Sequence, residues 1–134
     1  MMESNFNHAK KIIKEYIELL SYDPWITIKK LMDKKGVTQK ELASLLKLTD
    51  RSIRNYLSNK TKLSKDFLCG LCCILELPFM VSLELFKISG LELTLLGDNL
   101  FYFELLKTKE KYTIKKNLLR LKHKKVWKTV KNRK

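Results

Sequence analysis

The sequence predicts an all-helical protein that contains two short helices meeting at a tight corner. Apolar residues recur at three- and four-residue spacing along most of the chain. Capping residues precede several of these segments, namely Asp23, Thr38 and Thr49, and Gly36 ends the first of them. At 134 residues with 45% hydrophobic content, the chain has the size of one domain with a core of ordinary density.

The first helix of the corner begins after Thr38, which caps it, and Glu41 completes a capping box with that threonine. Its apolar face consists of Leu42, Leu45 and Leu46. Ala43 lies on the same face, and its small side chain lets another helix cross closely. We therefore expect this helix to pack beneath a second one.

The second helix follows a break at Lys47 and Leu48, with Thr49 as its N-cap. Ile53, Tyr56 and Leu57 form its apolar stripe. The positions that face outward are Asp50, Arg51, Arg54 and Asn55. Guanidinium and amide groups pair with base edges in the major groove of DNA, arginine with guanine and asparagine with adenine.

Residues 39–58 resemble the helix-turn-helix of the Cro and lambda-repressor class, the XRE family. That pattern has glutamine first, alanine fifth, and apolar residues at the fourth, eighth, tenth, fifteenth and eighteenth positions. The matching residues are Gln39, Leu42, Ala43, Leu46, Leu48, Ile53 and Tyr56. The family commonly has glycine at the ninth position, where the corner needs a positive φ, and this chain has Lys47. The resemblance thus implies a backbone strain of about 1 kcal/mol at Lys47.

The resemblance extends to both sides of the motif. Residues 23–38 are similar to the preceding helix, with Asp23 as cap and Pro24 in the first turn, and residues 66–93 are similar to the following helices. Regulators of this kind occur in Gram-positive bacteria and their mobile elements. We expect a lambda-repressor-like helical bundle at 23–91, an N-terminal amphipathic helix at 1–22, and a basic helical extension at 92–134 with a frayed end.

The resemblance implies a sequence-specific regulator of transcription, acting as a repressor, that reads the major groove of double-stranded DNA with the helix at 49–57. The expected DNA-binding residues are Gln39, Lys40, Thr49, Asp50, Arg51, Ser52, Arg54, Asn55, Ser58, Asn59 and Lys60. The first two would fix the register on phosphates, and the last three would contact the backbone after the recognition helix. Asp50 would orient Arg51 or Arg54 rather than contact a base. Regulators of this class often bind as dimers, so we expect a homodimer.

The positive charge is concentrated in the C-terminal part of the chain. Residues 107–134 hold 12 of the 14 net positive charges. Such an extension favours sequence-independent contact with phosphates, so Lys124→Ala should weaken binding to all sequences. We expect helices at 99–107 and 113–123, and a hairpin of 91–96 with 100–105 is the lesser alternative. The functionally neutral alternative is a solvated cationic helix that aids solubility.

The N-terminal segment has an apolar stripe of its own. It comprises Phe6, Ala9, Ile12, Ile13, Tyr16, Ile17 and Leu20. Packing onto the domain core is the expected role of this stripe, with self-association as the functional alternative.

Three clustered cysteines, Cys69, Cys72 and Cys73, are expected to pack a buried helix. A zinc site would need a fourth ligand, and His8 and His123 lie far away in the sequence. We therefore expect no metal and no cofactor, and the absence of a catalytic constellation predicts that the protein is not an enzyme. No apolar run approaches the ~20 residues that span a bilayer, so we expect a cytoplasmic protein without a membrane partner.

Two alternative functions remain open at this point. One is an antitoxin-like or adaptor protein, in which the helical extension binds a protein partner. The other is an RNA-binding protein that uses the basic extension. Only Tyr112 and Trp127 are interleaved with the charges of the extension, whereas single-strand readers usually offer more stacking aromatics.

Overall fold

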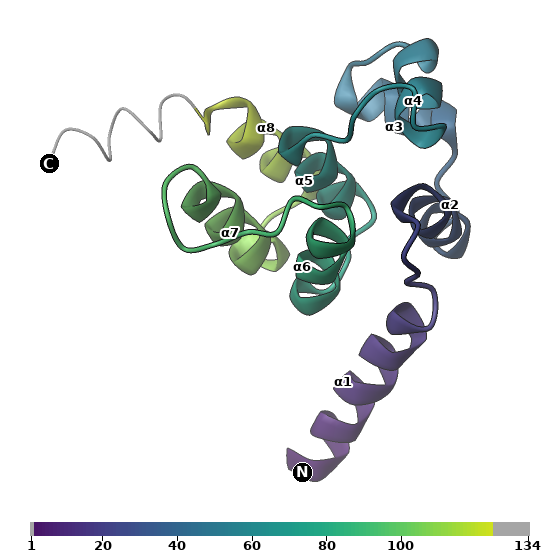
Figure 1. Ribbon diagram of the computed structural model, residues 1–134. Helices are drawn as coiled ribbons and strands as arrows, with labels where there is room; N and C mark the ends of the chain where they lie inside the picture. The colour runs from purple at the N-terminus through teal and green to yellow at the C-terminus, as the bar shows by residue number, and fades with distance from the viewer. Residues whose placement is uncertain (1, 125–134) are drawn as a thin grey trace, which may run out of the picture.

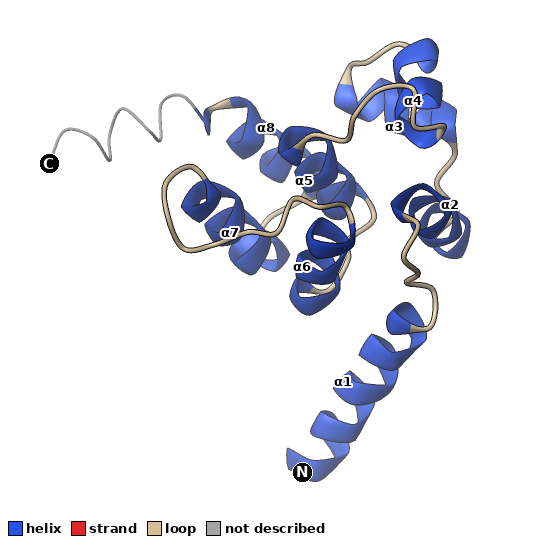
Figure 2. Cartoon of the chain, in the orientation of Figure 1, coloured by secondary structure: helices blue, strands red, loops and turns tan. Residues whose placement is uncertain are grey.

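The computed structural model describes residues 2–124, and within this range it contains helices and turns but no strand (Figure 1 and Figure 2). The helices are α1 (Met2–Ile17), α2 (Pro24–Lys35), α3 (Gln39–Leu46), α4 (Asp50–Leu57), α5 (Lys65–Ile74), α6 (Phe79–Ile88), α7 (Asn99–Thr108) and α8 (Ile114–Lys122). A short 3-10 helix, η1 (Lys109–Lys111), joins α7 to α8. The predicted all-helical class is confirmed.

The capping residues begin and end the helices that surround the corner. The Asp23 carboxylate accepts hydrogen bonds from the backbone N–H groups of Trp25 and Ile26 at 3.0 and 3.1 Å. Thr38 accepts from the backbone N–H of Glu41 at 3.1 Å, so this half of the capping box is confirmed. The reciprocal half is wrong, because the Glu41 carboxylate accepts from the Thr38 hydroxyl at 3.1 Å instead of from its backbone N–H.

Helix α5 forms the centre of the fold and packs against α3, α6, α7 and α8. Every residue from Phe67 to Leu75 is buried. The helix contains Gly70, where an added Cβ would lie 2.6 Å from a methyl group of Leu46 on α3 and 3.6 Å from one of Leu121 on α8. The small residue lets α5 lie close to both neighbours, which brings the extension at α8 into the same core as the helix-turn-helix.

The alternative of a hairpin over 91–105 is wrong, because Asn99 begins a helix there. The turn at Gly97 has a positive φ of 59°, and the C=O of Gly97 accepts from the backbone N–H of Leu100 at 3.2 Å as α7 starts. Four buried residues then follow at helical spacing, namely Phe101, Tyr102, Leu105 and Leu106. Their shared face buries more apolar area as a helix than an exposed hairpin would allow.

Helix α1 extends away from the rest of the molecule (Figure 1). It contacts α6, and its Tyr16 is buried and accepts a hydrogen bond from Lys35 Nζ of α2 at 3.1 Å. Ile12 and Ile17 are 37% and 50% exposed, so the expected packing of the whole stripe onto the core is wrong for these two residues. The side chains of Phe6 and Ala9 lie outside the described part, as does the expected fraying of residues 125–134. Among the described helices, none has the length and apolar character needed to cross a membrane.

Candidate nucleic-acid interface

The corner between α3 and α4 has the left-handed residue that the sequence pattern requires. Lys47 adopts φ 56° and ψ 43°. Its backbone N–H donates to the C=O of Ser44 at 3.3 Å, and the N–H of Leu48 donates to the C=O of Ala43 at 2.9 Å. These two bonds form a Schellman motif, which satisfies the last carbonyl groups of α3. Thr49 then begins α4 by accepting from the backbone N–H of Ser52 at 3.0 Å.

Lys47→Gly should raise the free energy of unfolding by about 0.5 to 1 kcal/mol. Glycine adopts a positive φ without the clash of Cβ with the backbone, although it loses more entropy on folding. Urea denaturation followed by circular dichroism measures the change. Lys47→Ala is the control, since alanine keeps the Cβ, and equal stabilisation by both variants would show that φ is not the cause.

Apolar contacts hold the inner face of α4 against the rest of the domain, and the outer face of the helix is turned away from these contacts. Ile53 and Leu57 are buried in the core. The ring of Tyr56 stacks on that of Phe67 in α5, with centroids 4.2 Å apart and an angle of 13° between planes. The corner packs α4 against both α2 and α3. These contacts fix the position of α4, so the side chains on its outer face are presented from a rigid helix.

The outer face of α4 presents the residues that the sequence predicts for base contact. Asp50, Arg51 and Arg54 are exposed, whereas Ser52 and Asn55 are half-buried. Within residues 2–124, no ion pair joins Asp50 to either arginine, so the expected orienting contact is not formed in this structure. Both guanidinium groups are thus available to an external acceptor.

The expected backbone contacts lie at two ends of the motif. Gln39 and Lys40 are exposed at the start of α3. Thr49, which was expected in the interface without an assigned contact, is exposed before the start of α4. Ser58, Asn59 and Lys60 are exposed after α4. The Ser58 hydroxyl already donates to the C=O of Arg54 at 2.7 Å, so it would have to rotate before it could donate to a phosphate.

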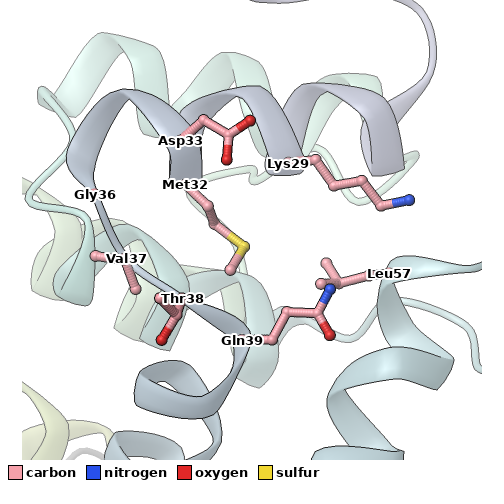
Figure 3. Close-up of a pocket in the computed structure, with 8 residues that line it drawn as sticks. All are labelled: Lys29, Met32, Asp33, Gly36, Val37, Thr38, Gln39 and Leu57. Atoms are coloured by element: carbon pink, nitrogen blue, oxygen red, sulfur yellow. The ribbon is translucent and has the colours of Figure 1, made fainter.

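A shallow cavity of about 280 Å³ lies where α2, α3 and α4 meet (Figure 3). Its lining includes Lys29, Thr38 and Gln39. In Figure 3 the Lys29 and Gln39 side chains extend in the same direction from opposite sides of the cavity. Lys29 is not among the DNA-binding residues expected from the sequence. The feature that could have indicated it is its polar position on the helix that precedes the motif. The cavity adds an ammonium group to the donors at the start of α3.

Fewer basic side chains of the extension are free to contact phosphates than its net charge suggests. Residues 107–124 contain eight Lys or Arg. Lys109 is buried, and Arg120 donates to Asn117 Oδ1 at 3.0 Å and to Thr108 Oγ1 at 2.7 Å. The exposed ones are Lys107, Lys111, Lys115, Lys116 and Lys122.

Lys124 forms internal contacts, which the sequence did not predict. Its Nζ lies 3.0 Å from Asp66 Oδ1 and 2.7 Å from the Tyr102 hydroxyl, so it joins the end of α8 to α5 and α7. Burial, together with the hydrogen bond to Asp66, raises the pKa of Tyr102. The expectation that Lys124→Ala reports phosphate contact therefore needs correction, because the substitution would also break this cluster.

The three cysteines pack the centre of the core, as the sequence predicts. Cys69, Cys72 and Cys73 are all buried on α5 as free thiols. Burial raises the pKa of Cys72 to about 12. A hydrogen bond with Cys73 and burial raise the pKa of Cys69. These two thiols therefore stay protonated at neutral pH and behave as small apolar side chains.

Residues 28–80 match a family model described as helix-turn-helix. The matched segment runs from within α2 to the start of α6 and includes the whole corner. No curated protein and no solved structure matches the chain.

Proposed function

We propose that the chain is a sequence-specific repressor of the Cro and lambda-repressor class that occupies duplex DNA through its helix-turn-helix domain at 28–80. The coarser function, a DNA-binding regulator of transcription, follows from the family. The observation that carries the finer proposal is the exposed outer face of α4, where Arg51 and Arg54 are free of ion pairs within residues 2–124. Because duplex DNA is the ligand, we place this activity in the cytoplasm.

Base recognition is assigned to the outer face of α4, inserted in the major groove. Arg51 and Arg54 would pair with guanine O6 and N7, and Asn55 with adenine N6 and N7. Asn55 is half-buried, and its backbone C=O accepts from the N–H groups of Lys60 and Thr61 at 2.9 and 3.1 Å. Its backbone is thus fixed, which supports a defined direction for its amide. Ser52 would reach a base or the backbone.

Phosphate contacts are assigned to groups that surround α4. Gln39 and Lys40 begin α3, where backbone N–H groups also point outward. Lys29 extends on the same side as Gln39 and would neutralise an adjacent phosphate (Figure 3). Thr49, Ser58, Asn59 and Lys60 would complete the contacts to the sugar-phosphate backbone. Such contacts fix the position of the reading helix on the duplex without selecting a sequence.

A homodimer is part of the proposal. Two half-sites separated by about 34 Å, one turn of duplex, would double the number of bases read. The exposed Ile12 and Ile17 on the projecting helix α1 support self-association, because a single helix with an apolar face has little stability away from a partner.

Selection of bound duplexes from a random pool tests the proposal as a whole. We expect a palindromic consensus whose half-sites contain guanine and adenine at adjacent positions. Random sequences after several rounds, with equal affinity for structured RNA, would contradict the proposal and favour the RNA-binding alternative. Stoichiometric co-purification of a protein from the native host, without any duplex selection, would favour the adaptor alternative.

Replacing Lys115, Lys116 and Lys122 together by alanine should weaken binding to all duplexes alike. Removing one lysine that neutralises a phosphate reduces the slope of log K against log salt by about 0.9. Fluorescence anisotropy at several salt concentrations, on the selected duplex and a scrambled one, measures both effects. Lys87→Ala on α6 is the control, since this exposed lysine lies on a helix outside the corner. An unchanged slope would show that α8 does not contact DNA.

A further inference from the structure

A buried ammonium group in η1 has no partner within the described chain. Lys109 is 4% exposed, and its Nζ forms no hydrogen bond there. A buried charge is costly unless it is paired, because burial removes its hydration. The neighbouring exposed lysine, Lys111, has no such constraint. The environment of Lys109 therefore leaves room for an anionic group from outside the chain.

Lys109 lines a cavity of about 170 Å³ between the end of α5, η1 and the start of α8. This volume corresponds to roughly six waters at ~30 Å³ each, so a molecule of several heavy atoms fits. The walls include Ile114, Tyr112 and the buried Cys73. The cavity is distinct from the corner of α3 and α4 and from the reading face of α4.

The backbone around Lys109 is held in place. Asn117, itself buried, donates through Nδ2 to the C=O of Lys109 at 2.9 Å and accepts from Arg120 at 3.0 Å. The charge of Lys109 also acts within the cavity. A hydrogen bond with Cys69, aided by the positive charges of Lys109 and Arg120, lowers the pKa of Cys73.

Two exposed carboxylates, Glu76 and Glu110, also line the cavity. They give it one buried cation and two accessible anions. A polyanion would be repelled by these carboxylates, and a simple cation would leave the Lys109 ammonium without a partner. A small molecule that carries both charges can pair with both kinds of group.

We propose that this cavity binds a small zwitterion of the amino-acid class, with its carboxylate on Lys109 Nζ and its ammonium group between Glu76 and Glu110. Ile114 and Tyr112 would contact the apolar part of such a ligand. A hydrogen bond from a buried ammonium to a carboxylate is charge-assisted, which makes it the strongest single contact available in the cavity. This site is independent of the proposed DNA-binding activity.

Titration of the full chain with glycine, acetate and methylammonium, followed by amide chemical shifts in NMR, tests the proposal. Sodium chloride at matched ionic strength is the reference. We expect saturable shifts at Cys73, Lys109 and Asn117 with glycine, shifts at the same residues with at least fivefold weaker affinity for acetate, and none with methylammonium. Equal affinities for glycine and acetate would overturn the assigned ligand class.

Three variants identify the contacts. Lys109→Met should reduce the affinity for both glycine and acetate at least tenfold, while Lys111→Met should leave both unchanged. Glu110→Gln should reduce the preference for glycine over acetate. The amide spectrum of each variant shows whether it is folded, and Glu110 is exposed, so its replacement does not disturb the core. Shifts that persist unchanged in Lys109→Met would show that the ligand does not pair with the Lys109 ammonium. The absence of a saturable shift with either ligand would show that water alone occupies the cavity. Either result would overturn the proposal.

Discussion

Arg54→Ala should abolish much of the preference for the selected duplex while leaving binding to scrambled duplexes nearly unchanged. A bidentate arginine-guanine pair contributes about 1 to 3 kcal/mol of discrimination, which corresponds to roughly 5- to 150-fold in affinity ratio. Arg54 is exposed on α4, and no salt bridge within residues 2–124 involves its guanidinium. The loss should therefore come from the DNA contact and not from the fold. Competition binding with both duplexes measures the ratio.

Lys87→Ala serves as the matched control for Arg54→Ala. Both residues are exposed and cationic in the last turn of a helix, so each substitution removes one positive charge from the same chain. Only the change on α4 should alter the ratio between duplexes. An equal decrease in affinity for both duplexes after Arg54→Ala would assign Arg54 to phosphate contact. The proposed division between base-contacting and phosphate-contacting residues would then be wrong.

Leu106→Ala should lower the free energy of unfolding by about 2 to 5 kcal/mol. Leu106 is fully buried on α7, so truncation leaves a cavity in the core that also contains Leu42 of α3. Global stabilities of small domains are about 5 to 15 kcal/mol, which makes this loss a large fraction of the total. Urea denaturation should show one cooperative transition at a lower midpoint.

The control is Leu119→Ala on α8, the same substitution at a position that is 42% exposed. Its cost should stay below about 1 kcal/mol, because surface substitutions leave no cavity. The domain boundary proposed at residue 91 is tested in the same experiment. If Leu106→Ala produced a separate early transition and left the rest of the chain at its original midpoint, α7 and α8 would form an independent unit.

The local features of the corner were predictable because each depends on residues within one turn of it. Thr38 and Thr49 cap α3 and α4 by accepting from N–H groups three residues later. The positive φ at Lys47 follows from the short corner between two helices, and the family pattern marks its position. The exposure of Arg51 and Arg54 follows from the stripe that buries Ile53. The base-contacting roles of these residues remain predictions.

Features that depend on distant segments were not predictable. Lys124 contacts Asp66, 58 positions earlier in the chain, and no local pattern distinguishes it from the exposed lysines nearby. The burial of Lys109 depends on how α8 packs against α5. The sequence shows the total charge of the extension, but which charges reach solvent is decided by tertiary packing. The same limit applies to the cavities, since their walls come from three elements each.

Helix α5 connects two sites that share no residue. Phe67 near its start carries the ring on which Tyr56 of α4 is stacked, and Cys73 near its end forms part of the cavity around Lys109. Cys73 lies six positions after Phe67, a rise of about 9 Å along the helix. Because α5 contributes to both places, a substitution that shifts this helix would disturb the packing of α4 and the cavity together.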